Sequence, residues 1–330
     1  MNTMNIELQD LQQRLADSNS TVRRVALLDL MDWAGDEHAT LFIAALCDPA
    51  AEVRAEAARA LEAFESPAGV AGLALLLADS DPQVRQAAAQ SLSEVKDPAS
   101  APLLLAQLEH ADPFVRAAVL RAVRALRSPH SYAPALAALD DGDSVVRREA
   151  VAVLGYLKQP DALPALTALV SRDADAEVRR AAVGAVGYAS NGRAAPALLG
   201  ALRDAAWQVR EEAATTLGKL RLAPAGENGV SLPQVVDALV AALDDSYWQV
   251  RLRAARSLGR LRHASALLAL LPLLQHQISN LRKEAALALG EIGDAAALSA
   301  LEPVAADPDP EVRKAARLAL GQILGAQGRR

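Results

Sequence analysis

Apolar residues recur along the whole chain in a unit of 31 or 32 residues. At one position of this unit a valine, once replaced by leucine, is followed by arginine in ten copies, and eight of the nine gaps between successive copies have one of these two lengths. A fixed period of this size indicates a stack of one small unit, because each unit has an apolar face that only its neighbours can cover. The pairs are Val22-Arg23, Val53-Arg54, Val84-Arg85, Val115-Arg116, Val146-Arg147, Val178-Arg179, Val209-Arg210, Val250-Arg251, Leu281-Arg282 and Val312-Arg313.

The pattern within each unit predicts two helices. Counted from the valine as position 0, apolar residues stand at 0, +4, +5, +8 and +11. At about 100° per residue these positions fall on one side of a helix, so an amphipathic second helix is expected. A shorter leucine-rich stretch lies upstream, as in residues 101–110, and predicts a first helix. Each repeat is therefore predicted to be a helical hairpin in an all-α fold.

The junctions between helices have sequences typical of helix starts. Ser or Asp followed by Pro predicts an N-cap and a first-turn proline. Such pairs precede first helices at Ser66-Pro67, Asp97-Pro98 and Ser128-Pro129, and second helices at Asp48-Pro49, Asp81-Pro82, Asp112-Pro113 and Asp309-Pro310. Glycine follows position +8 in six units, at Gly155, Gly187, Gly218, Gly259, Gly290 and Gly321. The missing side chain indicates close packing between units.

The repeats are expected to form a single solenoid domain over residues 1–330. The gap of 41 residues between Val209 and Val250 predicts a loop insertion at 221–233, rich in proline and glycine. Such an insertion either contacts a ligand or serves as a spacer. The predicted repeats span roughly 5–34, 36–65, 67–96, 98–127, 129–158, 160–190, 191–221, 232–262, 263–293 and 294–325.

An aspartate stands six residues before the arginine in eight of the ten units, at Asp17, Asp48, Asp79, Asp141, Asp173, Asp204, Asp245 and Asp307. This spacing and the consensus D-x-x-V-R-x-x-A-A-x-x-L-G resemble HEAT repeats, in particular the HEAT-like repeats of the phycobilisome-lyase type. The resemblance implies a right-handed α-solenoid, a superhelix of about ten two-helix repeats. It also implies that aspartate and arginine form a hydrogen-bonded ladder between adjacent repeats. His110 and His276 interrupt the aspartate column.

Composition narrows the classes of function. The formal net charge of -6 makes nucleic-acid binding a weak third hypothesis, because such binding needs many cations facing phosphates. No apolar stretch reaches the roughly 18 residues of a membrane span, and the N-terminus lacks the form of a signal peptide. A cytoplasmic protein without membrane contact is the default expectation. The single Cys47, at the end of a first helix, is expected to be a buried and inert thiol.

Aromatic residues mark a candidate binding surface. Positions +2, +3, +6 and +10 lie opposite the buried stripe of the second helix, and the HEAT resemblance implies that this helix lines the concave surface. Of the ten aromatics, five stand at these positions or at -2 and -1, in repeats four to eight. Large exposed aromatics are unexpected unless a partner covers them. The expected partner-binding residues are Trp207, Trp248, Tyr247, Phe114, Tyr156, Tyr188, Arg253, Arg256, Arg260 and Arg148.

Trp207 and Trp248 form the sharpest expected pair, because both occur in W-Q-V-R in adjacent repeats. They should lie roughly 10 Å apart. Glu149, Glu177, Glu211 and Glu212 interleave with the arginines, and such mixed charge is typical of a protein interface. The alternative is that the tryptophans fold back over the hairpin turns and close the helix ends.

The sequence has no pattern of a catalytic or metal site. The five histidines are scattered without metal-ligand spacing, and the repeated His-Glu dipeptides of the HEAT-like deoxyhypusine hydroxylases do not occur. No metal, cofactor or catalytic residue is predicted. The sequence therefore favours a noncatalytic scaffold, assembly factor or chaperone that binds another protein. The alternative, on resemblance alone, is a bilin lyase-like subunit that matures cofactor-bearing proteins.

Overall fold

The computed structural model describes residues 3–32, 35, 38–189, 192–222 and 229–327, and its regular elements within these ranges are helices. They form two compact units, residues 1–157 and 158–330. Unit 1 contains α1 (Thr3–Leu15), α2 (Ser20–Met31), α3 (Ala39–Ala45), α4 (Ala51–Ala60), α5 (Pro67–Leu76), α6 (Pro82–Ser93), α7 (Ala101–Leu105), α8 (Pro113–Leu126), α9 (Tyr132–Ala137) and α10 (Ser144–Leu157).

Unit 2 continues the alternation of first and second helices. It contains α11 (Leu163–Arg172), α12 (Ala176–Val186), α13 (Ala195–Ala201), α14 (Trp207–Leu217), α15 (Leu232–Ala241), α16 (Trp248–Leu261), α17 (Leu267–Leu270), α18 (Ser279–Ile292), α19 (Leu298–Leu301) and α20 (Pro310–Gln327). Many first helices are short because part of the same segment forms a 3₁₀ turn. Pro98–Ser100, for example, forms a 3₁₀ turn directly before α7. The all-α solenoid expected from the sequence is confirmed.

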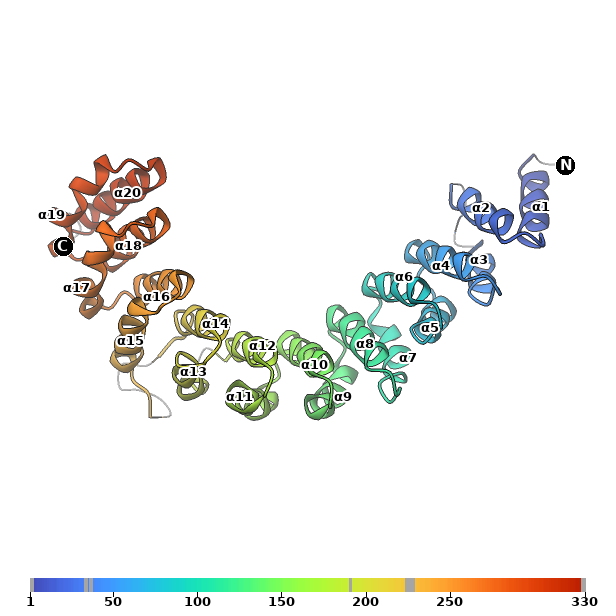
Figure 1. Cartoon of the computed structure of the whole chain (residues 1–330), viewed down its shortest axis with the longest axis horizontal. Coiled ribbons are helices and arrows are strands. Elements are labelled where there is room, and N and C mark those ends of the chain that lie inside the picture. The colour runs from blue at the N-terminus through green and yellow to red at the C-terminus, as the bar shows by residue number, and fades with distance from the viewer. Residues whose placement is uncertain (1–2, 33–34, 36–37, 190–191, 223–228, 328–330) are drawn as a thin grey trace. The chain divides into compact units, whose positions relative to one another are not determined.

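Each unit has two layers of helices. In unit 1, α2, α4, α6, α8 and α10 form a row of second helices, and α3, α5, α7 and α9 form the other layer (Figure 1). In unit 2 the even-numbered helices α12 to α20 form the corresponding row. The core lies between the layers, where the Val or Leu of each Val-Arg pair from Val53 to Val312 is buried. Val22 is only half-buried.

Successive second helices pack closely because glycine stands at their contact. A Cβ added to Gly259 would lie 2.7 Å from the Cα of Ala288 on the next second helix, and one added to Gly290 would lie 2.7 Å from the Cα of Ala319. Real Cβ atoms do not approach backbone so closely. The close packing predicted from these glycines is confirmed at both positions. Gly321, in α20, has nothing within 4 Å of the added atom.

Most of the predicted helix starts carry the expected cap. Oδ1 of Asp81 accepts hydrogen bonds from the N–H groups of Gln83 and Val84, and Asp112 caps Phe114 in the same way. Two predictions are wrong. α4 begins at Ala51, so Asp48 precedes its N-cap residue and accepts instead from the N–H of Ala50. Ser128 stands at an N-cap without a capping hydrogen bond from its side chain.

Two further expectations need correction. Cys47 is exposed, since it follows the end of α3. The predicted insertion 221–233 extends too far, because α15 already begins at Leu232 and is fixed by a capping box between Ser231 and Gln234. Residues 223–228 of that insertion lie outside the described residues. Whether the insertion contacts a ligand stays a prediction.

Candidate functional site

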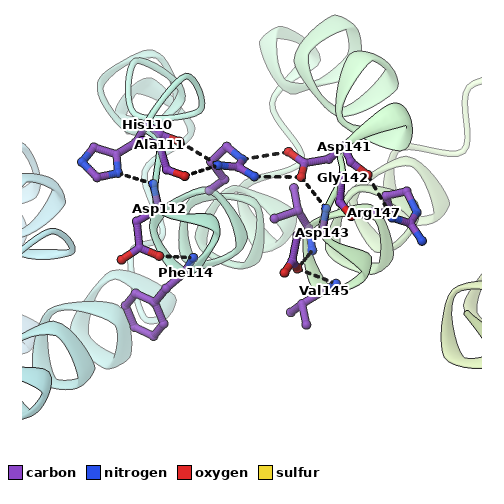
Figure 2. A network of polar contacts seen from close by, with 11 residues as sticks. His110, Ala111, Asp112, Phe114, Asp141, Gly142, Asp143, Val145 and Arg147 are labelled. Atoms are coloured by element: carbon purple, nitrogen blue, oxygen red, sulfur yellow. Dashed lines mark hydrogen bonds and ion pairs between the residues drawn. The ribbon is translucent and has the colours of Figure 1, made fainter.

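A ladder of arginine and aspartate side chains joins the repeats. Nε and Nη2 of Arg116 donate to the two carboxylate oxygens of Asp141 at 2.7 and 2.8 Å. Its Nη1 donates to the carbonyls of His110 and Ala111 in its own repeat, at 2.8 and 2.9 Å. Figure 2 shows this joint, with His110 and Ala111 on one side and Asp141 on the other. One guanidinium thus ties its own hairpin turn to the next repeat.

The same fork recurs in both units. It joins Arg23 to Asp48, Arg54 to Asp79, Arg179 to Asp204, Arg210 to Asp245 and Arg282 to Asp307. The hydrogen bonds from Arg116 lower the pKa of Asp141, and the hydrogen bond to Asp141 raises the pKa of Arg116. These arginines are therefore structural, as the resemblance implied.

The two histidines in the aspartate column change their joints. Nδ1 of His110 accepts a hydrogen bond from the N–H of Asp112 at 3.0 Å. In the next repeat, Oδ1 of Asp141 accepts the equivalent bond from the N–H of Asp143 (Figure 2). Neither histidine provides the carboxylate that the preceding arginine needs. Arg85 reaches Asp112 with Nη1 alone, at 3.1 Å. The buried Nε atoms of Arg85 and Arg251 have no hydrogen-bond partner among the described residues.

The candidate aromatics of unit 2 meet at the starts of α14 and α16. The rings of Trp207 and Tyr247 stack with centroids 5.3 Å apart and planes 13° from parallel. The guanidinium carbon of Arg210 lies 5.7 Å from the centre of the Tyr247 ring. Trp207 is half-buried, whereas Tyr247 and Trp248 are 45% and 36% exposed. The ring partner of Trp207 is therefore Tyr247, and the expected spacing of roughly 10 Å between Trp207 and Trp248 stays a prediction.

The other candidate aromatics divide between packing and exposure. Tyr188 is half-buried, and its hydroxyl donates to the carbonyl of Gln159 at 2.8 Å, so the expected free surface position is wrong. Phe114 is also half-buried, with the guanidinium of Arg85 5.2 Å from its centre. Tyr156 is 49% exposed, as expected. Among these three rings, the one open to a partner is that of Tyr156.

Arginines at position +6 form a second set of ion pairs, which was not predicted from the sequence. Arg256 donates to both carboxylate oxygens of Glu284, at 2.9 and 2.7 Å. Arg121 donates to Glu149 at 2.9 Å. Glu149 and Glu284 are buried, although position +3 was expected to be exposed. Each pair joins position +6 to position +3 of the next repeat across 28 residues, and this fixed spacing could have revealed it.

The remaining candidate arginines are more open. Arg253 pairs with Glu211 at 3.0 Å, from α16 back to α14. Arg260 is exposed near the end of α16, and Arg148 lies 3.9 Å from Glu149. Tyr247 and Trp248 thus lie at the start of α16, and Arg253 and Arg260 lie farther along the same helix. No group of three or more His, Cys, Asp and Glu that could hold a metal ion occurs in the described part of the chain.

Family models identify the repeat. The HEAT-repeat model matches residues 8–77, 70–155, 163–227 and 236–321. The chain is a HEAT-repeat protein. A model of the PBS lyase HEAT-like repeat also matches residues 146–172. The family suggested by the aspartate and arginine columns is therefore confirmed. Among the described helices of this HEAT-repeat protein, none is both long enough and apolar enough to cross a membrane.

Solved structures share the fold at low identity. An engineered protein gives a TM-score of 0.53 at 23% identity, over 98% of this chain and 99% of its own. Kap95p, whose binding induces the switch loops of RanGDP to adopt the GTP-bound conformation, gives 0.63 at 15% identity, over 98% of this chain and 50% of its own. Kap121p bound to the extreme C-terminus of the protein phosphatase Cdc14p gives a TM-score of 0.55 at 15% identity, over 96% of this chain and 41% of its own. A search of curated proteins finds no match.

Proposed function

We propose that this HEAT-repeat protein is a noncatalytic scaffold or assembly factor that binds a partner protein through unit 2. The observation that carries the proposal is the adjacent exposed pair Tyr247 and Trp248 at the start of α16. Exposed aromatics are typical anchors of protein interfaces because they bury a large apolar area at low entropic cost.

The surroundings of the pair fit an interface. The stack of Trp207 on Tyr247 holds one ring in place, and a fixed ring loses less conformational entropy on binding. Arg253 and Arg260 continue along α16 and add cations beside the rings. An apolar centre with a charged rim is the usual anatomy of a protein interface. Kap121p shows that a HEAT solenoid can bind a segment of another protein, which supports the proposal at the level of the fold.

Affinity purification from the native host, followed by quantitative mass spectrometry, tests the proposal. The Y247A/W248A double variant is expected to lose the partner that the wild-type chain captures. The matched control is L268A, which removes an apolar side chain that is 76% exposed on α17, in the other layer of unit 2. Equal capture by the wild type and the double variant would show that this surface is not the binding site.

The bilin lyase-like alternative depends on the match of residues 146–172 to the PBS lyase HEAT-like repeat. That segment contains Val146 and Arg147 of the repeat framework, which recur in every unit and carry no chemistry of their own. Absorbance titration of the full chain with a bilin is the direct test. A spectral shift at micromolar protein would support the lyase hypothesis, and an unchanged spectrum would leave the scaffold proposal as the better account.

A further inference from the structure

Four arginines gather on the second helices at the end of unit 1. Arg121 and Arg124 lie on α8, Arg127 is the C-cap residue of α8, and Arg148 lies on α10. We call them the unit 1 arginine cluster. The side chains of Arg121, Arg124 and Arg148 are 42%, 36% and 38% exposed. All three approach the buried carboxylate of Glu149, at 2.9, 3.4 and 3.9 Å respectively.

This cluster has more cations than its anion can neutralise. Glu149 is the single acidic residue in the sequences of α8 and α10. Three guanidinium groups share its two oxygens, and each of the three side chains remains more than a third exposed. In unit 2, Arg256, at the repeat position of Arg121, pairs with Glu284, and Arg253 pairs with Glu211. The sharing of one carboxylate by three guanidinium groups therefore distinguishes the unit 1 arginine cluster from these two pairs of unit 2.

The ring of Tyr156 lies beside two arginines of the cluster. The guanidinium carbons of Arg124 and Arg127 lie 5.8 and 5.5 Å from the centre of the exposed Tyr156 ring. Arg127 adopts a left-handed backbone with φ of 50°, a conformation that suits glycine better than arginine. Gly293 occupies the equivalent position after α18 with φ of 75°. Lys158 and Arg262 stand at the same repeat position with φ of 53° and 51°, so the left-handed helix end belongs to the repeat framework. What Arg127 adds to the cluster is a second guanidinium beside the Tyr156 ring.

We infer that the unit 1 arginine cluster binds an acidic segment of a protein partner, with side-chain carboxylates of Asp or Glu against the guanidinium forks. This inference rests on the proposed scaffold function and specifies a partner chemistry. Guanidinium groups recognise carboxylates through charge-assisted hydrogen bonds, and within the cluster Nε and Nη2 of Arg121 already donate to Oε1 of Glu149. A nucleic acid fits less well, because the cluster is small and the chain carries a net charge of -6.

The experiment measures binding of fluorescein-labelled decaglutamate to the full chain by fluorescence anisotropy. We expect saturable binding that weakens as salt is added. The R124Q/R127G variant should bind roughly tenfold more weakly, because it removes two of the cations that face the ligand. R127G relieves the left-handed strain at this position, and urea unfolding of R124Q/R127G shows whether the variant is folded under the conditions of the binding assay.

The chain offers a matched control. Arg262 is the C-cap residue of α16 with φ of 51°, so R262G makes the same change in unit 2. R262G should bind decaglutamate like the wild type. Equal binding by the wild type and R124Q/R127G, or equal losses in R124Q/R127G and R262G, would overturn the inference. Tighter binding of a single-stranded DNA of equal charge would also overturn it, in favour of a nucleic-acid ligand.

The same variants separate this inference from the proposed function. Y247A/W248A lies in unit 2 and should bind decaglutamate normally. If decaglutamate does not bind while the wild type still captures a partner that Y247A/W248A loses, the inference about the unit 1 arginine cluster is wrong and the scaffold function stands. If decaglutamate binds through the cluster while Y247A/W248A captures the partner normally, the inference stands and the unit 2 site is wrong.

Discussion

Nη1 of Arg251 lies 3.4 Å from Nε2 of His276, while Nδ1 of the same imidazole accepts a hydrogen bond from the N–H of Ile278 at 3.0 Å. A neutral imidazole whose Nδ1 accepts carries its proton on Nε2, so the contact with Arg251 sets one donor against another. Nε of Arg251 is buried without a partner among the described residues. The ladder between α16 and α18 therefore lacks the arginine–aspartate fork that Arg210 and Asp245 form between α14 and α16.

Replacing His276 by aspartate should strengthen this joint. The new carboxylate would accept from the N–H of Ile278 and from the fork of Arg251, as Asp245 does for Tyr247 and Arg210. We expect H276D to raise the free energy of unfolding by about 1 kcal/mol, the lower range for hydrogen bonds to charged groups that are partly exposed. Urea unfolding followed by circular dichroism measures the change.

The control for H276D is H130D, which makes the same charge change at an exposed histidine outside the aspartate column. Its effect should stay within about 0.5 kcal/mol, as for most surface substitutions. If both variants raise the free energy of unfolding equally, net charge and not the ladder is the cause.

Stability should also depend on the protonation of His276. Desolvation lowers the pKa of this imidazole, and the charges of Arg251 and Arg282 lower it further. An unfolded chain protonates histidine near pH 6.5, above the lowered native pKa. As the pH falls below about 6.5, the unfolded state therefore binds more protons, and stability declines until the native pKa is reached.

Thermal unfolding measured from about pH 8 to about pH 5.5 tests this dependence on pH. The midpoint of the wild type should fall more than that of H276Q, which cannot take up the proton. H263Q is a control at a histidine that contacts Ser265 and lies outside the aspartate column. Parallel curves for the wild type and H276Q would contradict the prediction.

The period of the sequence predicts the fold well because each repeat uses the same local rules. Val250 lies in the first turn of a second helix and is buried, Gly259 meets the next helix, and Arg54 finds the aspartate of the next repeat. These contacts depend on neighbours at a fixed separation. A regular sequence pattern therefore contains the information needed to place them.

The candidate site is less predictable because its contacts depend on side-chain direction and not on spacing. The position of Trp207 beside the start of α16 follows from the repeat, but its stacking on the ring of Tyr247, the residue that precedes α16, does not. Position +3 lies opposite the buried stripe of one helix, yet Glu149 is buried because a neighbouring helix covers it. A helical pattern describes one helix, whereas burial is determined by the helices packed against it.

Glycine at the contact between second helices should be essential where a neighbour is present. In G259A the new Cβ would lie 2.7 Å from the Cα of Ala288, and backbone cannot move aside cheaply. We expect a loss of about 1 to 3 kcal/mol from overpacking. G321A is the matched variant, because its Cβ has nothing within 4 Å. It should stabilise α20 by up to about 1 kcal/mol through helix propensity. Urea unfolding should therefore give opposite signs, and a loss in both variants would contradict this account.

Trp207 and Trp248 should separate stability from binding. Trp207 is half-buried and stacked on Tyr247, so W207A is expected to cost about 2 kcal/mol, less than a fully buried tryptophan. Trp248 is 36% exposed, and W248A should cost less than about 1 kcal/mol while it weakens capture of the partner. Urea unfolding and quantitative capture, measured on both variants, give the comparison. If W248A unfolds as easily as W207A, Trp248 closes the end of α16 as a packing residue, and the proposed binding surface of unit 2 is wrong.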